Sequence, residues 1–267
     1  MTENFKIDEA DVSKAIISNF MEELHDLTET DVIIVGAGPS GLVAATELAK
    51  NNIKTLIMER NIKPGGGMFL GGMLMNKLVV EHPAQELLRE AGVKTLKPYK
   101  EKLFVANAYE VSAKLMISAF DAGAKLLNGV EVVDVIYRKE GIKGVVANWH
   151  AVSSLPSWIT CVDPLAFKSR VVIDATGHNA EVAKIAGEKL GFAVKGKEGS
   201  MWVEQAEKAT IESTNEIYPG LIVTGMAANG AYGLPRMGPI FGAMFLSGIK
   251  AAKIALEIVS NKVPVEV

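Results

Sequence analysis

The sequence contains very little cysteine and no long uninterrupted apolar run. Its only cysteine is Cys161, which excludes an internal disulfide framework and a zinc site built from cysteine pairs. Charged residues interrupt every apolar stretch before it reaches the roughly 18 residues that a membrane span requires. Residues 1–14 are polar and acidic, without the apolar centre of a secretory signal. We therefore expect a cytoplasmic protein that does not bind a membrane.

The sequence also lacks the charge excess and the motifs of several large protein classes. Its 28 basic and 31 acidic residues give a net charge of -3, and no basic block predicts a nucleic-acid-binding face. The four histidines are not spaced as in a zinc hydrolase, and neither a P-loop nor a GxSxG motif occurs. With 267 residues and 49% hydrophobic composition, the chain can bury a sizeable core.

Alternating strand and helix patterns indicate an α/β fold with a Rossmann-like, flavoprotein-type dinucleotide-binding core. Residues 31–36 form a short apolar run typical of a buried parallel strand, and residues 38–52 have a helical pattern. Residues 54–60 predict the next strand, which completes a βαβ unit. Further predicted elements are strands at 126–138, 142–150, 170–177 and 220–225, and helices at 85–91, 108–122, 180–190 and roughly 237–259.

No linker divides the chain, so residues 1–267 are predicted to form a single dinucleotide-binding domain. Residues 1–30 precede the first strand and form a helical appendage, because apolar residues recur on one helical face. The segment from about residue 61 to residue 165 is expected to be an inserted, β-rich region, beginning with a glycine-rich loop at 61–76. The apolar face of the appendage consists of Val12, Ile16, Phe20, Leu24 and Leu27.

A dinucleotide-binding fingerprint follows the first predicted strand. Gly36 allows a tight turn, Gly38 allows the backbone to approach a pyrophosphate, and Gly41 allows close packing of helix and strand. Glu59 ends the next strand, about where an acid binds ribose hydroxyls. An acid there disfavours the 2′-phosphate of NADP, so the pattern leaves NAD and FAD open. The competing interpretation is an ordinary glycine turn beside a surface glutamate.

Four further polar residues are candidates for chemistry, and each has a plainer interpretation. His178 follows a predicted strand where α/β sheets place ligands, but could equally be a structural histidine. Arg236, at the start of the last predicted helix, could bind a carboxylate or lie in solvent. Cys161 and Asp163 share a loop, where a small buried thiol beside an Asp-Pro turn is the alternative.

Several motifs together resemble the thiamine thiazole synthase family. The resemblance extends from about residue 10 to residue 258. The glycine fingerprint alone fits many flavoproteins, whereas the other motifs are specific. They are PGGGMFLGGML (64–74), GVVANW (144–149), CVDP (161–164), ATGH (175–178) and RMGPIFGAMFLSG (236–248).

The resemblance implies an enzyme that consumes NAD as a substrate, together with glycine and a sulfur source, to form ADP-thiazole. It implies that Arg236 holds the glycine carboxylate, and that Asp163 and His178 from neighbouring subunits bind Fe(II). Carboxylate and imidazole ligands suit such a ferrous centre. A homo-octamer is expected. The dinucleotide contacts that the resemblance implies are Ser40, Glu59, Arg60, Gly67, Val133 and Met226.

Cys161 occupies the position that decides the sulfur source in this family. Members with cysteine there give up their own sulfur and work once, whereas members with another residue use free sulfide. This chain is short, as are the sulfide-using members, so both sources stay open. The main alternative to a thiazole synthase is an FAD-dependent oxidoreductase, and a dinucleotide-binding sensor is a non-enzymatic one.

Overall fold

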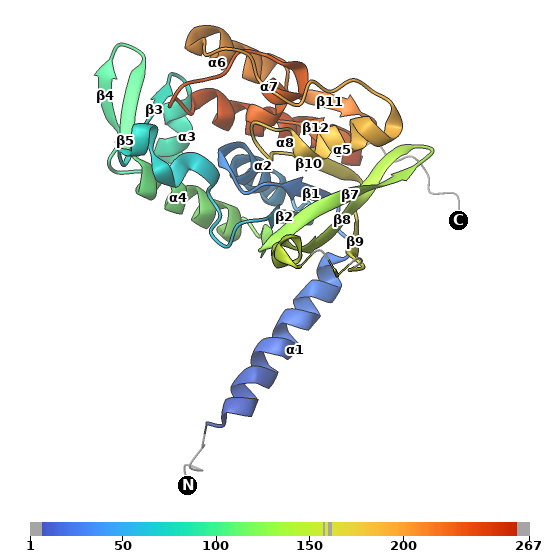
Figure 1. Cartoon of the computed structure of the whole chain (residues 1–267). Coiled ribbons are helices and arrows are strands. Elements are labelled where there is room, and N and C mark those ends of the chain that lie inside the picture. Colours follow the sequence, from blue (N-terminus) through green and yellow to red (C-terminus); the bar gives the residue numbers. More distant parts are fainter. Residues whose placement is uncertain (1–6, 157, 160–161, 261–267) are drawn as a thin grey trace.

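The computed structural model describes residues 7–156, 158–159 and 162–260, as a layered α/β body from which one helix projects (Figure 1). The projecting helix is α1 (Glu9–Leu27), and the Asp8 carboxylate caps it by accepting a hydrogen bond from the Ala10 backbone N–H at 2.8 Å. Only Leu27 of this helix is fully buried. The helical appendage is therefore present, and most of its apolar face is exposed. None of the described helices is long and apolar enough to cross a membrane.

A six-stranded sheet forms the centre of the body, as expected for a Rossmann-like core. Its strand order is β11-β12-β10-β1-β2-β6, and all neighbours are parallel except the edge pair β11 and β12. The strands β1, β2 and β10 are buried at every position, which explains their continuous apolar runs. The bounds are β1 Val32–Val35, β2 Thr55–Glu59, β6 Lys125–Asn128, β10 Val171–Asp174, β11 Asn215–Tyr218 and β12 Leu221–Val223.

Alternate residues of the central strands enter two separate cores on the two faces of the sheet. Val32 and Ile34 pack into the core beneath one helical layer, whereas Ile33 and Val35 pack into the core on the other face. The first layer contains α2 (Pro39–Lys50), α3 (Ala84–Glu90), α4 (Ala108–Asp121), α6 (Val203–Glu212) and α8 (Gly242–Ser260). The second contains α5 (Glu181–Leu190), α7 (Met226–Tyr232) and a small sheet.

The stretch from residue 61 to residue 165 is more divided than a single insertion. It contains an antiparallel sheet of order β3-β5-β4 and most of a second sheet of order β7-β8-β9. Between them, β6 pairs with β2 in the central sheet, and α4 packs on α2. The bounds are β3 Lys77–Glu81, β4 Lys97–Lys100, β5 Leu103–Asn107, β7 Val130–Arg138, β8 Gly141–Trp149 and β9 Leu165–Lys168.

Two predicted elements begin or break at different residues in the structure. The strand expected at 126–138 is two strands, β6 and β7, because Gly129 (φ +69°) turns the chain from the central sheet into the small one. The last helix begins at Gly242 instead of residue 237, because the preceding backbone pairs with β3 through Ile240 and Val79. The glycine-rich loop contains two short 3₁₀ helices, η1 (Gly66–Leu70) and η2 (Gly72–Leu74), and a third, η3 (His150–Ser154), follows β8.

Candidate functional site

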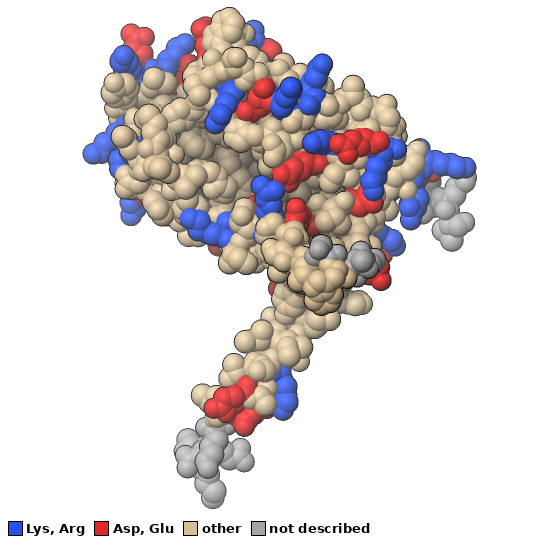
Figure 2. Space-filling view, in the orientation of Figure 1, with Lys and Arg blue, Asp and Glu red and all other residues tan. Residues whose placement is uncertain are grey.

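A cavity of about 580 Å³ opens where β1, β2 and β10 end. Figure 2 shows the corresponding face of the body hollowed near its centre. Such a volume is typical of a small-molecule site, and the carboxyl ends of parallel strands are where α/β sheets bind ligands. Nine residues expected from the sequence line this cavity: Gly36, Gly38, Ser40, Glu59, Arg60, Gly67, His178, Met226 and Arg236.

The glycine fingerprint has the geometry that its spacing predicts. Gly36 has φ +106°, and a Cβ there would lie 2.4 Å from the carbonyl oxygen of Ala175. A Cβ on Gly41 would lie 2.1 Å from the carbonyl oxygen of Gly36, so α2 can pack against the turn only without a side chain. A Cβ on Gly38 would meet nothing within 4 Å. The space beside Gly38 therefore belongs to the cavity, at the N-terminus of α2, where free backbone N–H groups favour a phosphate.

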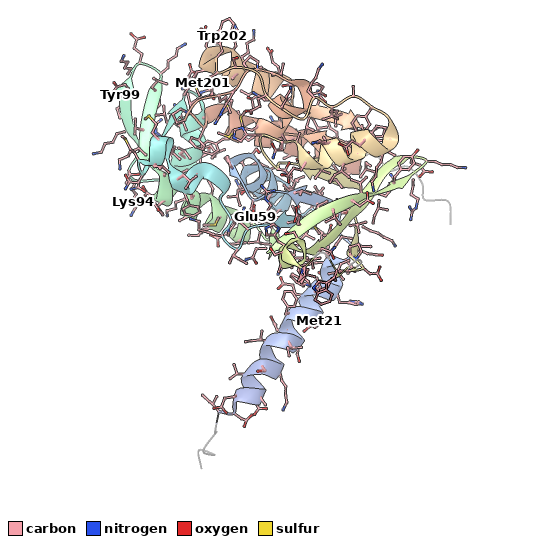
Figure 3. The ribbon with its side chains drawn as sticks, viewed as in Figure 1. Met21, Glu59, Lys94, Tyr99, Met201 and Trp202 are labelled. Atoms are coloured by element: carbon pink, nitrogen blue, oxygen red, sulfur yellow. The ribbon has the colours of Figure 1, made fainter. Side chains whose placement is uncertain are left out.

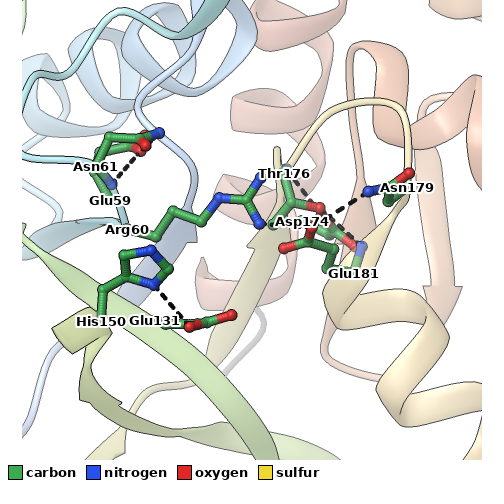
Figure 4. A network of polar contacts seen from close by, with 9 residues as sticks. All are labelled: Glu59, Arg60, Asn61, Glu131, His150, Asp174, Thr176, Asn179 and Glu181. Carbon is green, nitrogen blue, oxygen red and sulfur yellow. Dashed lines mark hydrogen bonds and ion pairs between the residues drawn. The ribbon is translucent and has the colours of Figure 1, made fainter. Parts of the chain in front are cut away.

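Glu59 is fixed at the end of β2, beside the fingerprint. It is 5% exposed, and its Oε2 accepts a hydrogen bond from the Ala37 backbone N–H at 2.9 Å. Its Oε1 accepts from both the backbone and the side-chain amide of Asn61 at 2.8 Å (Figure 4). Each carboxylate oxygen can accept more than one hydrogen bond, so the acid is oriented and can still receive ribose hydroxyls.

Two ion pairs on either side of the cavity were not anticipated from the sequence. Arg60 donates to Glu181 at 2.8 Å, and His150 contacts Glu131 at 2.8 Å (Figure 4). Glu131 and Glu181 both line the cavity, Glu131 from β7 and Glu181 from the first turn of α5. Arg60 follows β2, and Glu181 begins α5, which follows β10. The ion pair therefore connects the ends of β2 and β10, although β1 lies between these strands in the sheet.

The loop that carries His178 is shaped by the buried carboxylate of Asp174. One Asp174 oxygen accepts from the Thr176 N–H and hydroxyl, and the other accepts from the Ala183 N–H at 2.8 Å. Burial raises the pKa of Asp174, although these three hydrogen bonds favour its charged form. The Asp174 side chain therefore ties the start of α5 to the end of β10 and fixes the loop between them.

His178 projects from this loop, and its side chain is 57% exposed. Its Nδ1 lies 2.8 Å from Oε2 of Glu198, whose side chain is only 8% exposed. No sequence motif marks Glu198, because it lies in an irregular segment between α5 and α6. The structure therefore brings a predicted site histidine together with a carboxylate that the sequence did not single out.

Arg236 lies in the loop before α8 and not at the start of that helix, as the sequence had suggested. Its backbone N–H donates to Ser200 at 3.1 Å, and its carbonyl accepts from Trp202 at 3.1 Å. Met201, between these two residues, also lines the cavity; Met201 and Trp202 lie close together at the outside of the body in Figure 3. Arg236 is exposed and contributes to the same cavity as His178.

Three of the described residues predicted for the site do not line this cavity: Gly41, Val133 and Asp163. Gly41 is buried within α2, and Val133 is 41% exposed on β7, whereas its neighbours Glu131 and Val132 line the cavity. Asp163 is an exposed residue just before β9 and does not line the cavity. Cys161 lies outside the described residues.

A complete metal site is not formed by the described part of the single chain, where no three histidine, cysteine, aspartate or glutamate side chains converge. His178 nevertheless fits the role of one ligand, because the buried Glu198 holds Nδ1 and leaves Nε2 for a metal. An exposed Asp163 provides an oxygen ligand of the kind that suits Fe(II) together with imidazole.

The N-terminus of α8, next to the Arg236 loop, is capped by an acid with an altered pKa. Oε2 of Glu207 in α6 accepts a hydrogen bond from the Ala243 backbone N–H at 3.0 Å. Its Oε1 is buried without a hydrogen-bond partner among the described residues. Burial, and the nearby charge of Glu81, raise the pKa of Glu207 to about 7. This carboxylate therefore titrates near neutral pH in the folded protein.

Comparisons with known proteins agree with this architecture along nearly the whole chain. The Thi4 family model matches residues 13–241. The thiamine thiazole synthase of Methanothermobacter thermautotrophicus is 44% identical, covering 94% of this chain and 98% of that protein. The thiamine thiazole synthase of Aeropyrum pernix is 45% identical, covering 97% of this chain and 96% of that protein. The crystal structure of Thermovibrio ammonificans THI4 superposes with a TM-score of 0.89 at 39% identity, covering 96% of this chain and 98% of that one. The chain therefore belongs to the Thi4 family of thiamine thiazole synthases, enzymes of thiamine biosynthesis.

Proposed function

We propose that this chain forms ADP-thiazole from NAD, glycine and a sulfur source, using Fe(II) bound by Asp163 and His178. One observation carries the proposal: a single cavity is lined both by the glycine fingerprint with Glu59 and by His178 and Arg236. The first group alone accounts for binding of a dinucleotide. A cavity that also presents an imidazole and a guanidinium suits a dinucleotide that is itself converted.

Different residues of the cavity have different roles in such a reaction. The N-terminus of α2 and Glu59 bind the pyrophosphate and the adenosine ribose, which leaves the nicotinamide ribose at the end of the cavity near His178. Arg236 binds the carboxylate of glycine through two parallel hydrogen bonds and orients its amine. Fe(II), when bound, supplies a Lewis acid that binds sulfide and polarises the substrate carbonyl.

The remaining parts of the proposal concern assembly and sulfur. Asp163 and His178 come from neighbouring subunits of a homo-oligomer, for which we propose eight copies. The sulfur source is either free sulfide or Cys161 itself. NAD, glycine and sulfide are the only partners proposed.

The first test is to identify what the purified protein carries. We expect denaturation to release ADP-thiazole, NAD or an intermediate between them, because Glu59 and the fingerprint favour a dinucleotide that the enzyme consumes. Mass spectrometry of the supernatant identifies the molecule. Release of FAD instead would contradict the proposed reaction and favour a flavin-dependent oxidoreductase.

The same material also distinguishes the two sulfur sources. Protein incubated anaerobically with NAD, glycine and Fe(II), but without sulfide, loses the mass of one hydrogen sulfide at Cys161 if it donates its own sulfur. An unchanged protein mass, with many turnovers once sulfide is added, identifies sulfide as the donor.

Replacement of Arg236 by lysine is expected to raise the glycine concentration for half-maximal rate by about 10- to 100-fold. Lysine keeps the charge but lacks the planar pair of donors, and hydrogen bonds to charged groups contribute about 1.5–3 kcal/mol. NAD binding, measured by calorimetry, should change less than about twofold. Arg170→Lys, at an exposed arginine that does not line the cavity, is the control. Equal losses for glycine and NAD would place Arg236 outside the glycine subsite.

A further inference from the structure

The Nδ1 atom of His178 contacts the carboxylate of Glu198, a side chain that is almost inaccessible to solvent. The Nδ1–Oε2 distance to Glu198 is 2.8 Å, and the exposed fractions of the two side chains are 57% and 8%. An ionised carboxylate has no proton to donate, so the shared proton belongs to Nδ1 of the ring. Nε2 is then the ring nitrogen left to accept, and His178 lines the cavity.

Burial of the Glu198 side chain at this position destabilises the folded state. Its second oxygen, Oε1, has no hydrogen-bond partner among the described residues. A buried carboxylate with an unused oxygen destabilises a fold unless its charge is compensated nearby. Packing alone does not account for an acid here, whereas a requirement to orient His178 does.

The backbone on both sides of Glu198 is fixed, so its carboxylate has a defined position. Lys197 N–H donates to Gly230 at 3.1 Å, and Gly199 N–H donates to Leu234 at 2.8 Å. The same 195–202 segment contacts Arg236 through two backbone hydrogen bonds, made by Ser200 and Trp202. One irregular segment therefore supports both His178 and Arg236.

We propose that Glu198 is a positioning residue, which fixes the Nδ1–H form and the orientation of His178 so that Nε2 points into the cavity. The consequence for metal binding rests on the proposed role of His178 as a ligand. A hydrogen-bonded carboxylate behind a ligating imidazole sets the ring angle and raises its basicity, and loss of such a partner lowers metal affinity about 10- to 100-fold.

The test compares Glu198→Met, which keeps the length of the side chain but removes both oxygens, with Glu198→Gln, which keeps one acceptor. The nitrogen spectra of metal-free protein labelled with ¹⁵N-histidine report the ring form of each of the four histidines, and His178→Gln assigns the signal. Co(II), a redox-stable ion that accepts the same ligand types as Fe(II), measures metal affinity. Glu131→Met removes the equivalent contact to His150 and serves as the matched control.

In Glu198→Met we expect His178 to lose its fixed Nδ1–H form and Co(II) affinity to fall about 10- to 100-fold. In Glu198→Gln the amide oxygen keeps the Nδ1–H form, and the loss of affinity is smaller. Glu131→Met should change the His150 signal and leave that of His178 unchanged. NAD affinity should stay within about twofold in both Glu198 variants, because Glu198 does not line the cavity.

An unchanged His178 signal in Glu198→Met overturns the proposal. Should that variant fail to fold, an unchanged His178 signal in Glu198→Leu overturns it equally, because leucine also lacks the acceptor oxygens. Failure of the wild-type protein to bind Co(II), combined with a changed His178 signal in Glu198→Met, overturns the iron site of the proposed function and leaves the positioning role of Glu198 standing.

Discussion

A mixture of Asp163→Ala and His178→Ala subunits is expected to recover up to about a quarter of the wild-type rate, although each variant alone should lose about 100-fold or more. Each proposed metal site takes Asp163 from one subunit and His178 from the next. Random assembly of equal amounts then leaves about one site in four with both native ligands. Co-expression with two different affinity tags yields the mixed oligomers, and product formation is measured anaerobically.

Two features of the single chain support this expectation. His178 lines the cavity, whereas Asp163 lies outside its lining. Helix α1 projects from the body, and Ile16, Ile17 and Met21 are each more than half exposed; Figure 3 labels Met21 on this projecting helix. Apolar surface of this kind is commonly buried by a second copy of the chain.

The control is a mixture of His178→Ala with Arg236→Ala. Both residues line the cavity of one chain, so every mixed site keeps at least one defect and no activity should return. Recovery in this control, or its absence in the first mixture after both tags co-purify, contradicts the assignment of the two metal ligands to different subunits.

Replacement of Glu207 by glutamine is expected to stabilise the protein by about 2–3 kcal/mol at pH 8 and by much less at pH 5. Glutamine keeps an oxygen that accepts the Ala243 N–H but removes the buried charge. A glutamate with a raised pKa binds its proton more tightly in the folded state than in the unfolded one. Its charge therefore lowers the free energy of unfolding progressively from about pH 4.5 to about pH 7, and fully above that range.

Thermal unfolding at the two pH values checks this prediction. The expected rise in melting temperature at pH 8 is roughly 5–10 °C for a chain of this length. Glu204→Gln, on the exposed surface of the same helix, is the matched control and should change little at either pH. An equal effect of Glu207→Gln at pH 5 and pH 8 would show that Glu207 ionises normally.

The parts of the fold that were predictable from the sequence are those with strong local signals. The first βαβ unit was confirmed because its strands are buried on both faces and its turn requires glycine. Helices α6 and α7 were not predicted. Helix α7 (MAANGAY) consists mostly of small residues, so its sequence has no clear amphipathic pattern and the helix depends on tertiary packing. The break at Gly129 was missed because β6 and β7 are both apolar, and only their pairing separates them.

In the candidate site, too, the residues with a local sequence signal were predictable and those that depend on tertiary structure were not. Glu59 was predictable because a fixed spacing from the glycines places it at the end of the adjacent strand. Glu198 was not, since its contact with His178 depends on how an irregular segment crosses the ends of α7 and the Arg236 loop. The Arg60–Glu181 pair joins the residue after β2 to the first residue of α5, 121 positions later in the chain, which no local pattern reports.

The 195–202 segment also has a consequence for how the site responds to thermal motion. Glu198, which contacts His178, and Ser200 and Trp202, which contact Arg236, belong to the same short stretch of backbone. His178 and Arg236 themselves are 58 positions apart in the chain. A displacement of this segment moves both groups in the same direction and preserves the spacing between them. The spacing between His178 and Arg236 therefore depends on one short stretch of main chain. An insertion into residues 195–202 would let the two side chains move independently, even if every residue that lines the cavity were kept.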